Sequence, residues 1–182
     1  MFRWFETHAH LCDAQFDADR DDVVARSKEV GVSGIVEIAD GPDEWEKARA
    51  LAERHDGFMR WAGGIHPYVA DQASPESWGR LRKLSADPRF VAVGEVGLDY
   101  AKSPVPREVQ MRAFNEALDL AAELEKPLVI HCREAYADLL PMLRRRTWKG
   151  PESPGVIHCF SGDAEQAREL VAMGFFLLSL IH

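Results

Sequence analysis

The fold is decided by one stretch of sequence, Phe90-Val91-Ala92-Val93-Gly94-Glu95-Val96-Gly97-Leu98-Asp99-Tyr100. Its first half, from Phe90 to Gly94, is the short apolar run of a buried strand, and this run ends on Glu95. The segment after Pro106 then places apolar residues at helical spacing, namely Phe114, Ala117, Leu118, Ala121 and Leu124. A buried strand followed by an amphipathic helix is the unit of a parallel α/β fold.

The same alternation of short apolar runs and amphipathic segments continues along the chain. The expected strands lie at 4–7, 34–38, 59–63, 90–94, 127–130, 155–157 and 175–178. The expected helices lie at 19–30, 43–54, 74–85, after 106, around 139–143 and from 163 to 174. These elements make six βα units and part of a seventh, whereas a closed (β/α)₈ barrel typically needs about 250 residues. We therefore predict an incomplete TIM-like barrel, a single domain over 1–182 that lacks its C-terminal βα units.

Composition narrows the class of protein. The 182 residues carry a formal net charge of −8, which argues against a protein that coats DNA through a broad basic surface. Acidity does not exclude an enzyme that meets phosphates only at bound cations. No apolar run approaches the roughly 18 residues of a membrane span, and no signal peptide is evident at residues 1–6. The expectation is a cytoplasmic protein with no membrane partner, and three cysteines imply no disulfide framework.

Histidines and one glutamate follow the expected strands at the same end. His8 and His10 are two apart on a strand, so both side chains point to one face. Glu95, His131 and His158 each follow an apolar run. Parallel strands that deliver ligands from one end place them at the mouth of a barrel. Imidazole and carboxylate ligands suit zinc, manganese or magnesium, so the sequence predicts a metal site there.

Each residue also has a plainer interpretation. Histidines at strand ends often make ordinary hydrogen bonds, and a glutamate between glycines is often a surface residue. It is the co-occurrence of these residues on consecutive strands that favours metal binding. His66, in a glycine-rich loop, is either a donor to a ligand or a turn residue, and both interpretations stay open. Arg133 lies two residues beyond His131 and suits a phosphate or carboxylate oxygen, or else an internal ion pair.

Two cysteines directly follow motif histidines. Successive strand residues point to opposite faces, so we expect Cys132 and Cys159 to face the helices if the histidines face the barrel axis. Both are predicted to be buried packing residues rather than metal ligands.

Five motifs, taken in order, resemble the TatD family of metal-dependent deoxyribonucleases: Thr7-His8-Ala9-His10-Leu11, Gly64-Ile65-His66-Pro67-Tyr68, Gly94-Glu95-Val96-Gly97-Leu98-Asp99-Tyr100, His131-Cys132-Arg133-Glu134-Ala135 and His158-Cys159-Phe160-Ser161-Gly162. The resemblance implies a TIM-like barrel with two divalent ions (Mg, Mn or Zn) and DNA, or alternatively RNA, as substrate. It further implies that His8 and His10 hold one ion, that His131 and His158 hold the other, and that Glu95 bridges both as the catalytic carboxylate. His66 and Arg133 would then line the pocket for the scissile phosphate.

One departure from the family pattern concerns its last motif, an aspartate in a Glu-Thr-Asp segment. The stretch 177–182 has no counterpart to it. Two alternatives to a nuclease therefore stay open: an inactive truncated fragment of such an enzyme, and an amide or lactone hydrolase of the same superfamily.

Overall fold

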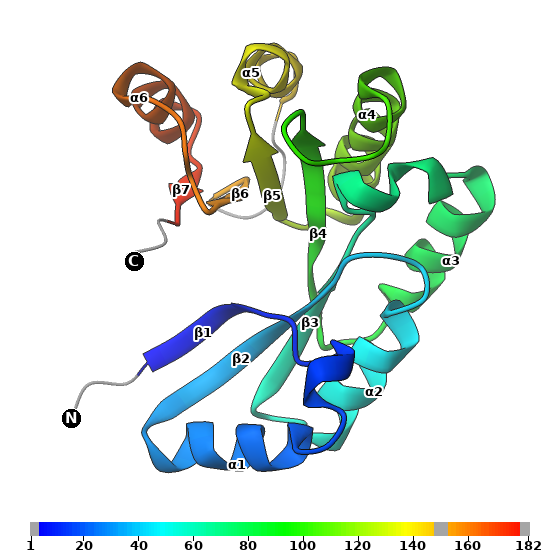
Figure 1. The fold of residues 1–182 in the computed structure, drawn as a ribbon, viewed down its shortest axis with the longest axis vertical. Coiled ribbons are helices and arrows are strands. Elements are labelled where there is room, and N and C mark those ends of the chain that lie inside the picture. Colours follow the sequence, from blue (N-terminus) through cyan, green and yellow to red (C-terminus); the bar gives the residue numbers. More distant parts are fainter. Residues whose placement is uncertain (1–3, 148–152, 179–182) are drawn as a thin grey trace.

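The structure is a computed structural model that describes residues 4–147 and 153–178. It contains a curled sheet of seven strands in the order β1 to β7, with neighbouring strands parallel throughout. Figure 1 shows helices along the outer face of this sheet, with β1 and β7 at its two edges. The strands are β1 (Trp4–Ala9), β2 (Val32–Ala39), β3 (Met59–Gly63), β4 (Phe90–Asp99), β5 (Leu128–Arg133), β6 (Gly155–His158) and β7 (Phe176–Leu177).

One helical segment or more follows each strand from β1 to β6. The α-helices are α1 (Arg20–Glu29), α2 (Trp45–Arg54), α3 (Pro75–Leu84), α4 (Arg107–Leu124), α5 (Tyr136–Arg144) and α6 (Ala164–Ala172). This succession of βα units in a curled parallel sheet confirms the predicted TIM-like barrel class. The extent of the single domain, 1–182 without its last units, stays a prediction. No helix within 4–147 or 153–178 is long and apolar enough to cross a membrane.

The main core lies between the sheet and the helices. Trp45, Trp61 and Phe90 are completely or almost completely buried there, as is the inward face of α4. That face consists of Phe114, Ala117, Leu118 and Ala121, the residues whose spacing predicted the helix. A smaller apolar cluster of Ile38, Ala62, Ala92 and Val129 comes from alternate residues on neighbouring strands. The apolar pattern therefore places the sheet and its helices as expected.

Two differences from the predicted elements affect the site. Strand β4 does not end at Gly94 but continues to Asp99, and β5 continues to Arg133, so the motif residues lie within the sheet. Short 3₁₀ helices, η1 (Ala14–Phe16) and η2 (Pro67–Gln72), form where loops were expected. Residues 179–182, the end of the stretch that departs from the family pattern, lie outside the described residues.

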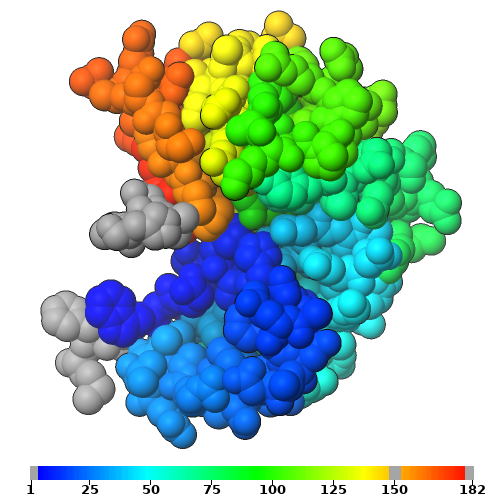
Figure 2. Space-filling view, viewed as in Figure 1, coloured from blue at the N-terminus to red at the C-terminus, as the bar shows by residue number. Residues whose placement is uncertain are grey.

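Strand register brings the motifs level with one another. Gly97 pairs with His131, and His131 pairs with His158. Figure 2 shows the N-terminal segment, in blue, meeting the orange segment near 160 in the middle of the molecule. The stacked rings of His8 and His158, with centroids 3.5 Å apart, join these two parts of the chain. The curl of the sheet thus brings the ends of β1 and β6 together.

Candidate metal centre

Four of the predicted ligands, all histidines, converge around the fifth, Glu95. His8 Nε2 lies 3.0 Å from Glu95 Oε2 and 3.0 Å from His10 Nε2. On the other side of the carboxylate, His131 Nδ1 lies 3.0 Å from Glu95 Oε1. His158 stacks on His8. Their convergence is as expected, although Glu95 lies within β4 rather than at its end. Their roles as ligands stay predictions.

The donor atoms form three overlapping groups. Within each group the potential ligand atoms lie within 4.8 Å of one another, and Glu95 belongs to all three: His8, Glu95 and His158; His66, Glu95 and His131; His10, Asp40 and Glu95. A carboxylate has two oxygens and can serve two cations at once, whereas a neutral imidazole presents one free nitrogen. The two oxygens of Glu95 could therefore each contact a different cation.

Glu95 is buried yet favours the charged form. Burial opposes ionisation of the carboxyl, but hydrogen bonds with His131 and His8 outweigh it and hold the pKa of Glu95 well below its ordinary value. Burial also disfavours the charged imidazolium of His131. Its contacts with Glu95 and Asp99 nevertheless raise the pKa of this imidazole. The two carboxylates that flank His131 thus favour the protonated form of its ring.

The imidazoles fit a divalent cation. Burial lowers the pKa of both His66 and His158 to about 4, so both rings are neutral at pH 7, which is the form that binds metals. The Nδ1 atoms of His8 and His158 are buried without a hydrogen-bond partner among the described residues. A buried nitrogen without a partner is costly, and a cation would satisfy it. Nitrogen and carboxylate donors of this kind suit Zn²⁺ or Mn²⁺, and carboxylates suit Mg²⁺ as well.

Two further carboxylates belong to the site and received no role in the sequence analysis. Asp99 is completely buried, and its Oδ2 lies 3.0 Å from His131 Nε2. Asp40 Oδ2 lies 3.7 Å from His10 Nδ1, and burial together with the charges of Glu95 and Glu44 raises the pKa of Asp40 to about 8. Asp40 directly follows β2 and Asp99 ends β4. The rule that identified Glu95, a polar residue shortly after an expected strand, would have identified Asp40. Asp99 lies five residues beyond the expected end of its strand at Gly94.

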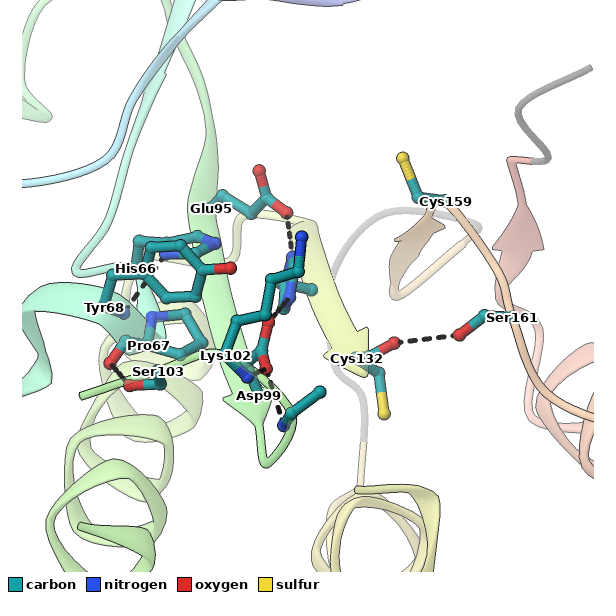
Figure 3. Close-up of polar contacts among 12 residues, drawn as sticks. His66, Pro67, Tyr68, Glu95, Asp99, Lys102, Ser103, Cys132, Cys159 and Ser161 are labelled. Atoms are coloured by element: carbon teal, nitrogen blue, oxygen red, sulfur yellow. Dashed lines mark hydrogen bonds and ion pairs between the residues drawn. The ribbon is translucent and has the colours of Figure 1, made fainter. Parts of the chain in front are cut away.

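The predicted direction of Cys159 is wrong. Cys132 is buried beside Tyr136 of α5 and faces the helices as expected. Cys159 instead lines the same cleft as Glu95, with its Sγ 2.7 Å from His158 Nε2. Figure 3 shows the two sulfurs pointing in opposite directions. Strand β6 ends at His158 and Cys159 has a φ of 48°, so the alternation of strand faces no longer holds at this residue.

The two predicted phosphate-binding residues differ in exposure. His66 is 8% exposed, and its ring lies 4.6 Å from the ring of His131, close enough to join the donor groups. Its Nδ1 accepts a hydrogen bond from the backbone N–H of Tyr68 and so caps η2, as Figure 3 shows. Arg133 is exposed at the end of β5, level with Asp99. His66 lines a cleft of about 510 Å³ together with His10, Asp40 and Glu95, whereas Arg133 is not among the residues that line it.

A curled parallel sheet that gathers imidazoles and carboxylates at one end is the architecture of barrel-type metal-dependent hydrolases. Residues 5–180 match the model of the family described as "TatD related DNase". The chain belongs to this family, which confirms the family and the barrel fold that the resemblance implies.

Individual relatives agree with this assignment. The 3'-5' ssDNA/RNA exonuclease TatD of Cronobacter sakazakii is 39% identical over 173 residues, covering 95% of this chain and 65% of that protein. The uncharacterized metal-dependent hydrolase YabD of Bacillus subtilis is 37% identical, covering 95% and 67%. The crystal structure of YJJV, a TatD homologue from Escherichia coli K12, matches with a TM-score of 0.87 at 30% identity, covering 96% and 67%. The chain thus spans about two thirds of the length of these relatives.

Proposed function

We propose that this chain hydrolyses phosphodiester bonds in DNA, with RNA as a second substrate, at a centre of two divalent ions. The observation that carries the proposal is the position of Glu95, which belongs to all three groups of donor atoms and offers an oxygen to each side. The relative from Cronobacter sakazakii, named as an ssDNA/RNA exonuclease, supports the substrate class. Bound ions would activate a water molecule and offset charge on the phosphate oxygens.

The proposed role of each residue follows from its position around Glu95. His8 and His10 would hold one ion, and His131 and His158 the other, with Glu95 between them. The stacking of His158 on His8 places its ring near the first position as well, so its assignment to the second ion is part of the proposal. Asp40 and Asp99 offer further carboxylate oxygens beside His10 and His131.

His66 and Arg133 are proposed to bind the scissile phosphate. Because His66 Nδ1 accepts the N–H of Tyr68, the neutral ring carries its proton on Nε2, which can donate to a phosphate oxygen. The guanidinium of Arg133 is exposed and can form paired hydrogen bonds with phosphate. These two side chains would orient the phosphate while the charged centre acts on it.

The test is cleavage of a labelled single-stranded DNA by the purified chain with Mg²⁺ or Mn²⁺, and with EDTA as control. Metal-dependent shortening of the DNA is the expected result, with an RNA of the same sequence as the second substrate. His66→Ala and Arg133→Ala should raise KM for DNA without loss of bound metal. Metal binding without any cleavage would contradict the proposed activity and favour the inactive alternative, and cleavage of a lactone but not of DNA would favour the other hydrolase class.

A further inference from the structure

The loop that follows His10 has its backbone held by charged side chains. The backbone N–H of Leu11 donates to Glu37 Oε2 at 2.9 Å, and the N–H of Cys12 donates to Glu37 Oε1 at 2.7 Å. One carboxylate from β2 thus receives two successive amide groups from a segment 25 and 26 residues earlier in the chain. Such double acceptance fixes the direction of the loop as well as its distance from the sheet.

Glu37 is an unusual residue to find in the sheet. It is completely buried, and it pairs in register with Ala9, the residue between His8 and His10. Burying a carboxylate is costly unless its oxygens receive hydrogen bonds. Both oxygens of Glu37 receive them from the loop. An apolar residue would fill the same space without the free-energy cost of burying a charge. We therefore attribute the presence of a carboxylate here to the two backbone N–H groups that it accepts.

Arg20 holds the same loop from the other side. Its Nε donates to the carbonyl oxygen of Leu11, and its terminal nitrogen donates to the carbonyl oxygen of Asp13 at 3.2 Å. Asp17 Oδ1, 2.6 Å from the guanidinium, keeps Arg20 in place. The peptide groups on both sides of Leu11 are therefore fixed between an acidic and a basic side chain.

His10 depends on this loop for its position. Its side chain is 39% exposed, and its contacts with Asp40 and Glu95 are long, at 3.7 and 4.0 Å. His8, by contrast, is 5% exposed and packs against the ring of His158. The close side-chain contact of His10 is with His8, 3.0 Å between their Nε2 atoms, and the rest of its support comes from the backbone that follows it.

We propose that Glu37, assisted by Arg20, is a positioning residue that holds loop 11–13 and thereby directs His10 towards Glu95. The inference rests on the proposed metal centre, because the role of His10 as a ligand belongs to that proposal. Glu37 itself touches neither an ion nor a substrate in this account. It acts through the backbone that follows the His8–His10 pair.

The first experiment compares amide hydrogen exchange in the metal-free wild-type chain and in Glu37→Gln. Glutamine keeps the shape but offers one acceptor oxygen, and its NH₂ group faces the second amide donor. Exchange at Leu11 and Cys12 should become about 10-fold faster or more, because a buried N–H loses its partner. Asp87→Asn is the matched control, since Asp87 is a 5%-exposed carboxylate that accepts the N–H of Arg89 at 2.8 Å, at the opposite end of β4. It should leave exchange at 11–12 unchanged.

The second experiment titrates the same proteins with Mn²⁺. Replacing residues that orient ligands costs about 10- to 100-fold in metal affinity, so one binding step of Glu37→Gln should weaken by that factor and the other should keep its wild-type affinity. Faster exchange at 11–12 with unchanged Mn²⁺ binding would overturn the positioning role. Equal weakening by Asp87→Asn would also overturn it, since a general loss of stability would then explain the effect.

Arg20→Met provides a second route if Glu37→Gln does not fold. Arg20 is 22% exposed, so its loss should be tolerated, and the same Mn²⁺ step should weaken by a smaller factor. Unchanged binding in Arg20→Met would count against the proposal. If the wild-type chain binds no Mn²⁺, the proposed function fails, and the exchange rates at Leu11 and Cys12 still decide whether Glu37 holds the loop.

Discussion

Gly97 is the position where one added methyl group should disturb both the sheet and the site. Its φ of 145° lies in a region that other residues rarely adopt, and a Cβ there would lie 2.0 Å from the carbonyl oxygen of His131. Strands β4 and β5 would have to separate by more than about 1 Å to reach ordinary contact. Backbone strain of about 1–3 kcal/mol and a similar cost of overpacking give about 2–6 kcal/mol for Gly97→Ala. That is a large part of the roughly 5–15 kcal/mol that stabilises a domain.

Two other glycines allow the cost of backbone strain to be measured separately from the cost of overpacking. Gly57 has a φ of 80° but open space around it, so Gly57→Ala should cost only the strain, about 1–2 kcal/mol. Gly79 lies in α3 with nothing near its Cβ position, so Gly79→Ala should stabilise by about 0.5–1 kcal/mol. Urea denaturation followed by circular dichroism measures all three. A Gly97→Ala variant as stable as the wild type would refute the close approach of β4 to β5.

Three further predictions concern charge, pH and thiol reactivity. If Glu95 bridges two ions as proposed, Glu95→Gln should reduce Mn²⁺ affinity by more than about 100-fold, because the side chain loses its charge. An affinity within about a factor of ten of wild type, measured by calorimetry, would exclude the bridge. The hydrogen bond from Arg89 lowers the pKa of Asp87 below its ordinary value of 3.8, so this pair stabilises the fold above that pH and ceases to do so as the pH falls through the lowered pKa. Asp87→Asn should therefore destabilise by about 1–2 kcal/mol at pH 7 and progressively less in acid, as measured by denaturation at several pH values. Cys159 should react with a maleimide at pH 8 faster than Cys132 does. Cys132 is 3% exposed, and burial raises the pKa of its thiol to about 12. Peptide mapping that finds Cys132 modified first would contradict the opposite directions of the two sulfurs.

The sequence predicts the fold well where the pattern is local. The apolar run from Phe90 and the helical spacing from Phe114 identify β4 and α4, because strand and helix periods differ and neither segment carries a conflicting signal. The ends of the strands are less predictable. Glycines interrupt the second half of β4, and their reduced strand preference conceals the fact that pairing with β5 continues to Asp99.

Sequence analysis identifies those site residues that directly follow an apolar run. It misses those whose role depends on contacts between distant parts of the chain. The five clustered ligand candidates follow from polar residues placed just after apolar runs, and the same rule would have identified Asp40. It would have missed Asp99, because β4 continues past its expected end at Gly94. Cys159 was misjudged because the strand ends one residue earlier. Glu37 could not be assigned from sequence, because its partners in loop 11–13 are reached only through the pairing of β1 with β2.

The most direct test of the central claim is the position of metal ions in a crystal of this chain grown with Mn²⁺. Anomalous scattering identifies each ion and the atoms that surround it. The account predicts two ions at the carboxyl ends of the strands, each about 2.0–2.2 Å from a different oxygen of Glu95, with His8 and His131 on opposite sides. Ions bound elsewhere, or a single ion without contact to Glu95, would contradict it.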